Sequence, residues 1–543
     1  MTPTPALTRT AQIARLGQRR FDLLVIGGGI TGAGIARDAA RRGLDVALVE
    51  RDDFASGTSS RSSRLVHGGV RYLEHGHLRL VFESCHERRV LLRLAPHLVR
   101  PMQFTWPVYE GDRIPLWQVR AGLALYDLLA LFRNVAPHRG LTIAGVAAAE
   151  PMLAHHALRG GAQYYDAHTD DARLTLATIL DAAVSGATVL NHATVTELRY
   201  ADGRACGAVV TERLGGRTLD ISASCVVNAT GPWTDAIRRL EDPSAAPAVL
   251  GSKGVHIAVP AERVGNRGAV TLLAVDGRVM FVLPAGTCTI IGTTETETTE
   301  SPGEVRATRA DVDYLLASAN HIFPNAALGA DDVIAAWAGI RPLAALAHSG
   351  DANSASREHL VATGPRGVIT VTGGKLTTYR VIARDVIDVV FRALNRRSPR
   401  VRTDLIPLAG GDVRDLDAEQ ATARAATGTD DVAEWLVHAY GGAWHQVWAR
   451  AEGDAALGAR LVKGLPYIAA EVAHAVEAEF ACTVADVLVR RMHLAFETRD
   501  HGLSVAARVA ALMAPALGWT DRGVDGAVSD YGADIARLFA INP

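Results

Sequence analysis

The order of apolar and polar positions is most regular between Phe21 and Glu50. Residues 23–26 form an uninterrupted apolar run, which is typical of a buried strand in a parallel sheet. Residues 33–42 place apolar side chains at helical spacing, with arginines on the opposite face. A second apolar run follows at residues 46–49. The pattern therefore predicts a strand, a helix and a second strand in close succession.

Three glycines, Gly27, Gly29 and Gly32, form a GxGxxG motif between the first strand and the helix. In such a loop the first glycine permits a tight turn, the second leaves room for a pyrophosphate, and the third lets helix and strand pack closely. The helix N-terminus attracts the phosphates. Glu50 ends the second strand, where a carboxylate can accept hydrogen bonds from ribose hydroxyls. This unit predicts an adenine dinucleotide, either NAD or FAD.

Residues 56–63, which follow this unit, are dense in small hydroxyl side chains. A solvated loop is the usual interpretation of such a composition. Because the stretch follows the predicted ribose-binding strand and leads into His67-Gly68-Gly69, we favour a second loop that contacts phosphate and flavin. Residues 78–94 then place apolar side chains at helical offsets and predict an amphipathic helix.

Later segments extend the predicted sheet and add others. Residues 225–231 and 368–374 each form a buried strand that ends in a turn of small residues. The second turn opens a helix at Lys375, and the N-terminus of this helix is expected to point at the cofactor ring. Residues 251–334 alternate as expected of an antiparallel sheet over the cofactor. Ala-rich periodic segments beyond Pro399 predict a separate helical domain.

The predicted fold class is α/β, of the two-dinucleotide-binding-domain type: a Rossmann-like dinucleotide-binding domain with an antiparallel substrate sheet, followed by a C-terminal all-α domain. In the helical domain, Arg490 and Arg491 are interpreted either as a solvated helix face or as facing the body of the protein. The predicted units are a basic N-terminal arm (1–20), three parts of the dinucleotide-binding domain (21–100, 161–245 and 336–398), a substrate- or membrane-contacting insertion (101–160), the antiparallel substrate sheet (246–335) and the helical cap (399–543).

Composition narrows the class of protein. A chain of 543 residues is long enough for two or three domains. A formal net charge of -2 gives no reason to expect nucleic acid as a partner. The five cysteines are scattered without ligand spacing, which fits a reducing cytoplasm and predicts no metal site. Residues 1–20 contain four arginines and no acid, and we interpret them as a loosely ordered arm or as a basic contact with an anionic surface.

Several motifs together resemble the FAD-dependent glycerol-3-phosphate dehydrogenases, specifically the quinone-linked aerobic type. One departure is Glu295, at a position where that family usually has Asp. The resemblance extends from about Phe21 to the end of the chain. It rests on GGGITGAGIARDAA (27–40), SSRSSRLVHGGVRYLE (59–74), VNATGPW (227–233), KGVHIAV (253–259), IIGTT (290–294), GIRPL (339–343), SREHLV (356–361) and GGKLTTYR (373–380).

The resemblance implies tightly bound FAD, and it assigns residues to the cofactor. The expected FAD-binding residues are Gly27, Gly29, Gly32, Glu50, Thr58, Ser59, Ser63, His67, Gly68, Gly69, Thr230, Gly231, Gly339, Gly374, Lys375, Leu376 and Thr377. Lys375 and its helix dipole would stabilise negative charge on reduced flavin.

The same motifs contain a set of cationic side chains, which indicates an anionic substrate because a guanidinium binds phosphate with two hydrogen bonds. The resemblance implies oxidation of sn-glycerol 3-phosphate to dihydroxyacetone phosphate. His256 is the expected general base because the unperturbed pKa of histidine lies near neutral pH; alternatively it only orients Thr293 or the substrate. The expected substrate-binding residues are Arg71, Tyr72, Thr293, Arg341 and Arg357, and the expected catalytic residues are His256, Arg341 and Lys375.

Residues 114–134 form an apolar segment with Arg113, Arg120 and Arg133 at its margins. It is either a helix that packs on the core or a monotopic membrane contact, assisted by the basic arm. No segment reaches the roughly 20 apolar residues of a membrane-spanning helix. The resemblance implies a membrane quinone as electron acceptor and a peripheral location on the inner face of the cytoplasmic membrane. An oxidase that uses oxygen, a flavin-bound sensor without turnover and a homodimer all stay open.

Overall fold

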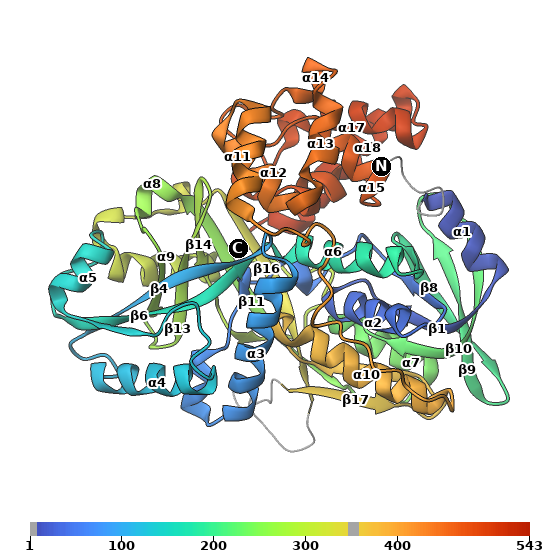
Figure 1. Ribbon diagram of the computed structural model, residues 1–543, viewed down its shortest axis with the longest axis horizontal. Helices are drawn as coiled ribbons and strands as arrows, with labels where there is room; N and C mark the ends of the chain where they lie inside the picture. Colours follow the sequence, from blue (N-terminus) through green and yellow to red (C-terminus); the bar gives the residue numbers. More distant parts are fainter. Residues whose placement is uncertain (1–7, 346–357) are drawn as a thin grey trace.

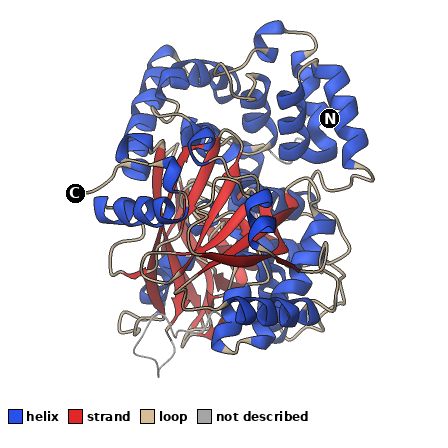
Figure 2. Ribbon diagram, turned by 90° about the vertical axis from the view of Figure 1, so that its left-hand side faces the viewer, coloured by secondary structure: helices blue, strands red, loops and turns tan. Residues whose placement is uncertain are grey.

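Two sheets and a helical domain make up the part of the chain that the computed structural model describes, residues 8–345 and 358–543 (Figure 1). The first sheet has eight strands and the second has ten. Seen from the side, the helices of the C-terminal part stand above the strands (Figure 2). The predicted class, an α/β fold with a C-terminal all-α domain, is confirmed. Within the described residues, none of the helices has the length and apolar character needed to cross a membrane.

The first sheet contains the predicted glycine-motif strand at its centre. Its main path runs β17-β18-β10-β1-β2-β7, and the pairs from β18 to β7 are parallel. The hairpin of β8 and β9 joins β10 in antiparallel fashion. The strands are β1 (Arg20–Ile26), β2 (Val46–Val49), β7 (Thr188–Leu190), β8 (Ala193–Ala201), β9 (Arg204–Glu212), β10 (Thr218–Asn228), β17 (His359–Thr363) and β18 (Ile369–Gly373).

Strand β1 is buried on both faces, as its apolar run predicts. Leu23 and Val25 belong to one core cluster, whereas Leu24 and Ile26 belong to another on the opposite face. The first cluster lies against helices α2 (Ile30–Arg41), α6 (Asp171–Val184) and α10 (Tyr379–Ala393). The alternation of side chains in a strand thus fixes the sheet between two apolar layers.

The second sheet covers the predicted antiparallel region and also takes strands from residues 65–169 and 335–344. Its main path runs β15-β11-β14-β13-β12-β4-β6-β3, with β16 beside β11 and β5 beside β6. Only β4 and β12 pair in parallel among the pairings described. The strands are β3 (Leu65–Val66), β4 (Val99–Tyr109), β5 (Arg139–Leu141), β6 (Leu158–Thr169), β11 (Val249–Pro260), β12 (Ala269–Leu273), β13 (Val279–Ala285), β14 (Cys288–Gly292), β15 (Thr296–Glu297) and β16 (Ala335–Ala344).

The remaining helices lie around the sheets or form the C-terminal domain. The predicted helix at residues 78–94 is α3, with the same bounds. Around the sheets lie α1 (Arg9–Gln18), α3 (Leu78–Leu94), α4 (Leu116–Leu129), α5 (Ile143–Ala149), α7 (Thr234–Glu241), α8 (Ala261–Val264) and α9 (Arg309–Ile322). The C-terminal domain contains α11 (Leu416–Thr427), α12 (Asp430–Tyr440), α13 (Trp444–Ala451), α14 (Ala455–Gly458), α15 (Ala470–Ala478), a π-helical turn (Asp486–Arg491), α16 (Leu494–Glu497), α17 (Leu503–Leu517) and α18 (Asp521–Phe539).

A buried ion network fixes the C-terminal domain to the first sheet. Asp53 Oδ2 accepts hydrogen bonds from Arg490 Nε and Arg491 Nη1, each at 2.6 Å. Arg490 also pairs with Asp486, whose other oxygen lies 3.0 Å from His192 Nε2. The interpretation of the two arginines as a solvated face is therefore wrong, and they face the body of the protein. Although Asp53, His192 and Asp486 have the spacing of metal ligands, the guanidinium groups supply the positive charge to the carboxylates.

The N-terminal segment departs from its prediction. Residues 9–18 form helix α1, with Gln12 and Leu16 buried, so a loosely ordered arm is wrong for this part; residues 1–7 lie outside the described residues. Arg9 forms a 2.6 Å ion pair with Glu212. Helix α1 and helix α4 lie at opposite ends of the molecule (Figure 1).

Candidate active site

A cavity of ≈ 450 Å³ lies between the two sheets and collects most of the predicted site residues. Gly32, Gly68 and Gly69 do not line it, and Arg357 lies outside the described residues. The predicted residues that line the cavity are Gly27, Gly29, Glu50, Thr58, Ser59, Ser63, His67, Arg71, Tyr72, Thr230, Gly231, His256, Thr293, Gly339, Arg341, Gly374, Lys375, Leu376 and Thr377.

The glycine motif has the geometry that its spacing predicts. Gly27 has φ +109°, and a Cβ atom there would lie 2.6 Å from the Ala229 carbonyl oxygen. A Cβ atom at Gly32 would overlap the Gly27 carbonyl oxygen, so this residue serves packing between helix and strand. At Gly29 only Ser59 Oγ, at 3.2 Å, lies near the place of a Cβ atom. The first turn of α2, with its positive dipole, is thus accessible from the cavity.

Glu50 is held in place by backbone groups on both sides. Its Oε2 accepts a hydrogen bond from Gly28 N at 2.6 Å, and its Oε1 accepts one from Asp52 N at 2.9 Å. Burial raises the pKa of the Glu50 carboxyl above its ordinary value. The carboxyl group therefore has a fixed orientation at the end of β2, where a ribose is expected.

The hydroxyl-rich stretch of residues 56–63 joins both sheets across the cavity. Ser59 Oγ accepts a hydrogen bond from Ile30 N at 2.9 Å, and Thr58 Oγ1 donates to the Ile340 carbonyl at 2.7 Å. Ser63 Oγ lies 2.9 Å from His256 Nε2. The prediction that this stretch is a second loop at the cofactor site, rather than a solvated loop, therefore has a geometric basis.

Gly68 and Gly69 shape the turn behind the cavity instead of lining it. Gly68 N donates a 3.0 Å hydrogen bond to Asp166, and a Cβ atom at Gly68 would overlap the Tyr126 hydroxyl group. Gly69 has φ +82°, a conformation that favours glycine. Both residues position the neighbouring His67, which does line the cavity.

Three cationic side chains gather at one end of the cavity. Arg341, on β16, donates a 2.9 Å hydrogen bond to Thr293 Oγ1. The Tyr72 ring lies between the other two, with Arg71 Cζ at 5.2 Å and Lys375 Nζ at 3.8 Å from its centroid. Arg71 also lies 3.8 Å from Glu295, the residue that departs from the family pattern. This end of the cavity is electropositive and suits an anionic group.

His256 lies at the same end and is buried. Its ring is stacked on Trp337, with centroids 5.5 Å apart and an interplanar angle of 13°. Burial, with the nearby charges of Arg341 and Arg64, lowers the pKa of His256 to about 3. The imidazole is therefore neutral at neutral pH, and its affinity for a proton is low. The assumption of a pKa near neutrality, on which the choice of this residue was based, is wrong for this environment.

Sequence reasoning missed residues at the opposite end of the cavity and at its wall. Arg51 lies over the Trp233 ring, with its Cζ 4.5 Å from the centroid, and both residues line the cavity near Glu50. Arg61 also lines the cavity, and burial lowers its pKa to about 10. The sequence signals that point to these residues are the place of Arg51 next to Glu50, of Trp233 in the VNATGPW motif and of Arg61 inside the hydroxyl-rich stretch.

The residues of the cavity fit the FAD that the resemblance implies. The accessible helix N-terminus and the bare Gly29 suit a pyrophosphate, and Glu50 suits a ribose. Lys375 and the turn at Gly374 lie at the electropositive end, where the flavin ring is expected.

Two family models match the chain. A model described as FAD dependent oxidoreductase matches residues 22–380, and one described as C-terminal domain of alpha-glycerophosphate oxidase matches residues 401–524.

Relatives match over almost the whole chain. Glycerol-3-phosphate dehydrogenase 2 of Mycobacterium tuberculosis (strain H37Rv) is 39% identical, covering 96% of this chain and 89% of the relative. The mitochondrial glycerol-3-phosphate dehydrogenase of Homo sapiens is 38% identical, covering 95% and 73%. The crystal structure of the glycerol-3-phosphate dehydrogenase from Bacillus halodurans complexed with FAD is 33% identical, with a TM-score of 0.81 over 99% of this chain and 98% of that one.

Proposed function

This chain belongs to the family of FAD-dependent glycerol-3-phosphate dehydrogenases, and we propose that the residues of its cavity oxidise sn-glycerol 3-phosphate to dihydroxyacetone phosphate in the following way. The observation that carries the proposal is the convergence of Arg71, Arg341, Lys375 and His256 at one end of a cavity whose other end holds the glycine motif and Glu50. When FAD is bound, its flavin accepts a hydride from C2 of the substrate.

The electropositive end of the cavity binds the substrate phosphate. Arg341 and Arg71 present guanidinium groups from two different structural units, β16 and the turn after β3, so they can approach a phosphate from two sides. Thr293 holds the guanidinium of Arg341 at 2.9 Å and limits its rotation. Arg357 is proposed as a third phosphate ligand from the motif alone. Tyr72 supports the site because its ring makes cation–π contacts with both Arg71 and Lys375.

His256 receives the proton of the C2 hydroxyl group. Because burial and the charges of Arg341 and Arg64 lower its pKa to about 3, the ring is neutral in the physiological range but a weak base. A bound phosphate offsets these positive charges and so favours proton uptake by the ring. The hydrogen bond between Nε2 and Ser63 Oγ fixes the ring edge. Positive charge on Arg341 and Lys375 favours the alkoxide character that develops at the substrate oxygen. The role of His256 is thus to hold a proton at Nε2, the nitrogen beside Ser63 Oγ, while the arginines orient the substrate.

Anaerobic titration with sn-glycerol 3-phosphate tests this function. The yellow holoprotein should bleach on addition of substrate, and unphosphorylated glycerol should bleach it only at much higher concentrations. A spectrum that does not respond to glycerol 3-phosphate would refute the proposal. Reoxidation by a quinone analogue and by oxygen should then be compared, because the proposed acceptor is a membrane quinone and an oxidase would react rapidly with oxygen.

Helix α4 supports the proposed contact with a membrane. Val119, Leu123 and Tyr126 on one face are buried in the core, as the core-packing interpretation expects. The other face and the turn that follows the helix expose a set of large apolar side chains, which we call the α4 patch: Trp117, Leu125 and Leu128 on the helix, and Leu131 and Phe132 in the turn.

The core-packing interpretation describes the buried face of the segment, and the exposed apolar face supports the proposal of a membrane contact. Arg120 and Arg133 are exposed beside the α4 patch. Arg120 donates a 3.2 Å hydrogen bond to the Leu141 carbonyl and Arg113 pairs with Glu74 at 2.9 Å, so Arg133 is the better candidate for a contact with lipid headgroups. The helix lies on the side of the molecule away from the C-terminal domain (Figure 1). We propose that this patch holds the enzyme on the inner face of the cytoplasmic membrane, where a quinone is available.

A further inference from the structure

The His256 ring has two contrasting neighbours in the second sheet. His256 on β11 is paired with Gly292 on β14 and with Trp337 on β16. A Cβ atom at Gly292 would overlap the imidazole ring, so only glycine leaves room on that side. On the other side the indole of Trp337 lies nearly parallel to the imidazole, at a centroid distance of 5.5 Å. The backbone wall and the indole therefore restrict the plane of the imidazole, while the hydrogen bond between Nε2 and Ser63 Oγ fixes its edge.

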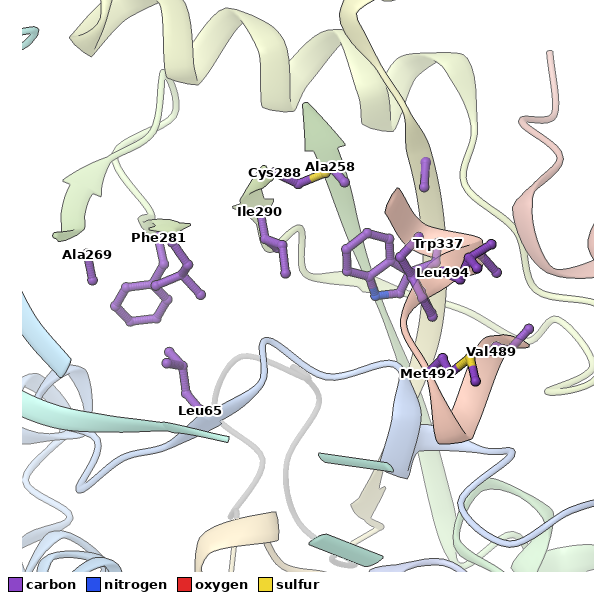
Figure 3. Close-up of a cluster of buried hydrophobic side chains, with 14 of the residues drawn as sticks. Leu65, Ala258, Ala269, Phe281, Cys288, Ile290, Trp337, Val489, Met492 and Leu494 are labelled. Atoms are coloured by element: carbon purple, nitrogen blue, oxygen red, sulfur yellow. The ribbon is translucent and has the colours of Figure 1, made fainter. Parts of the chain in front are cut away.

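Trp337 is in turn held by the C-terminal domain. The Phe496 ring meets the indole edge-to-face, with centroids 5.1 Å apart and an angle of 84°. Figure 3 shows Trp337 between the strands that bear Ala258, Cys288 and Ile290 and the C-terminal segment that bears Met492 and Leu494. Arg64 adds a cation to this contact, because its Cζ lies 4.9 Å from the Phe496 centroid and 5.9 Å from that of Trp337.

The segment that carries Phe496 is itself fixed on both sides. His493 Nε2 lies 2.6 Å from Asp170 Oδ2 at the start of α6, so the segment is anchored to the first sheet's helices. On its far side the Phe496 ring packs against Phe539 of α18, with centroids 5.0 Å apart. Phe496 is 5% exposed and Trp337 is 2% exposed, which leaves little room for either ring to tilt.

We propose that Phe496 is a positioning residue for His256, acting through Trp337. The C-terminal domain is then part of the catalytic framework, although it contributes no residue to the wall of the cavity. Without the Phe496 ring, the indole can tilt away and the imidazole loses the surface that sets its plane. The inference rests on the proposed function in one respect, because it takes His256 as the group that receives the substrate proton.

Stopped-flow flavin reduction in Phe496→Leu holoenzyme tests the inference. An edge-to-face aromatic contact is worth roughly 2- to 10-fold in an equilibrium, so the rate of reduction at saturating glycerol 3-phosphate should fall by about 3- to 10-fold. The apparent substrate affinity should change by less than about 2-fold, because the arginines are untouched. Phe496→Tyr, which keeps the ring, should restore most of the rate. Phe496→Met is made in parallel as a second ring-free variant that fills the volume flexibly.

Two further variants decide how an effect is interpreted. Phe480→Leu removes another phenylalanine of the C-terminal domain, one that packs edge-to-face on Phe54 at the Glu50 end, and it should leave the reduction rate unchanged. In a His256→Asn background, Phe496→Leu should have no additional effect. A full rate in both ring-free variants, or an equal loss in the His256→Asn background, would overturn the inference. If His256→Asn itself reduces flavin at the wild-type rate, the proposed base is wrong instead.

Discussion

Replacing Leu128 and Phe132 by glutamate should release the holoenzyme from anionic vesicles. These two side chains of the α4 patch are 53% and 71% exposed, so most of their apolar surface is available for insertion. Full burial of a large apolar side chain contributes about 1.5–3 kcal/mol, which gives roughly 1–2 kcal/mol for each exposed part. The double variant should thus lose about 2–4 kcal/mol of membrane binding, or roughly 30- to 1,000-fold in the partition coefficient.

The choice of residues follows from the orientation of α4. Leu123 and Leu129 also belong to the apolar segment, but Leu123 is fully buried and Leu129 packs against the core, so a charge at either would destabilise the fold. A matched control is Val184→Glu with Leu214→Glu, two side chains that are 73% and 49% exposed on α6 and on the β9–β10 turn. The control should co-sediment with vesicles as the wild type does.

Co-sedimentation is measured over a range of lipid concentrations, with FAD content and thermal unfolding as checks on the fold. If the variant at Leu128 and Phe132 retains FAD and still pellets like the wild type, then α4 is not the docking surface. A loss of binding in the control as well would show that any added negative charge weakens association, and would also refute the assignment to α4.

Three further predictions concern the cavity. Arg341→Ala should weaken the apparent affinity for glycerol 3-phosphate by about 10- to 100-fold and that for glycerol much less, because a charge-assisted hydrogen bond contributes roughly 1.5–3 kcal/mol. Arg341→Lys should recover only part of this affinity. Equal losses for both substrates in a steady-state assay would exclude a phosphate site at Arg341. His256→Asn should slow flavin reduction by about 10²–10⁴-fold. Since the pKa of His256 is lowered to about 3, the pH profile of the wild-type rate should show no rise due to this residue between about pH 5 and 8. A rise near the ordinary histidine pKa of about 6.5 that disappears in the variant would contradict the lowered pKa. Gly29→Leu should abolish FAD binding by filling the space beside the first turn of α2, and a variant that purifies with full flavin absorbance would contradict that placement.

Features that depend on neighbouring residues in the chain could be predicted from the sequence. The strand at residues 46–49 and the helix at residues 78–94 have their predicted bounds, because apolar periodicity alone defines them. The roles of Gly27 and Gly32 also follow from spacing, since each acts within one turn of the chain. Most of the residues that the motif resemblance assigned to the site line the same cavity.

Features that depend on distant segments were missed. Asp53 and Arg491 are 438 positions apart. No local sequence pattern indicates that Arg490 and Arg491 are buried against Asp53. The lowered pKa of His256 has the same origin, because its neighbours on β14 and β16 and the charges of Arg341 and Arg64 come from distant segments. Helix α1 was missed for a smaller reason: four arginines suggested disorder, whereas two buried side chains and one ion pair suffice to hold it.

The strand order of the first sheet has a consequence for biosynthesis. The glycine motif is made early, but β1 pairs with β10, and the turn at Gly374 that closes the cavity follows β18. At roughly 5–20 residues per second, a ribosome needs about 20–70 s between the synthesis of Gly29 and that of Thr377. Strand β1 can pair with β2 early, but its other neighbour β10 is complete only at Asn228, roughly 10–40 s after β1, and the cavity wall at Gly374–Thr377 comes later still. Flavin loading is therefore a late event for a nascent chain, and the β10 edge of the apolar β1 strand is unpaired until β10 has been made.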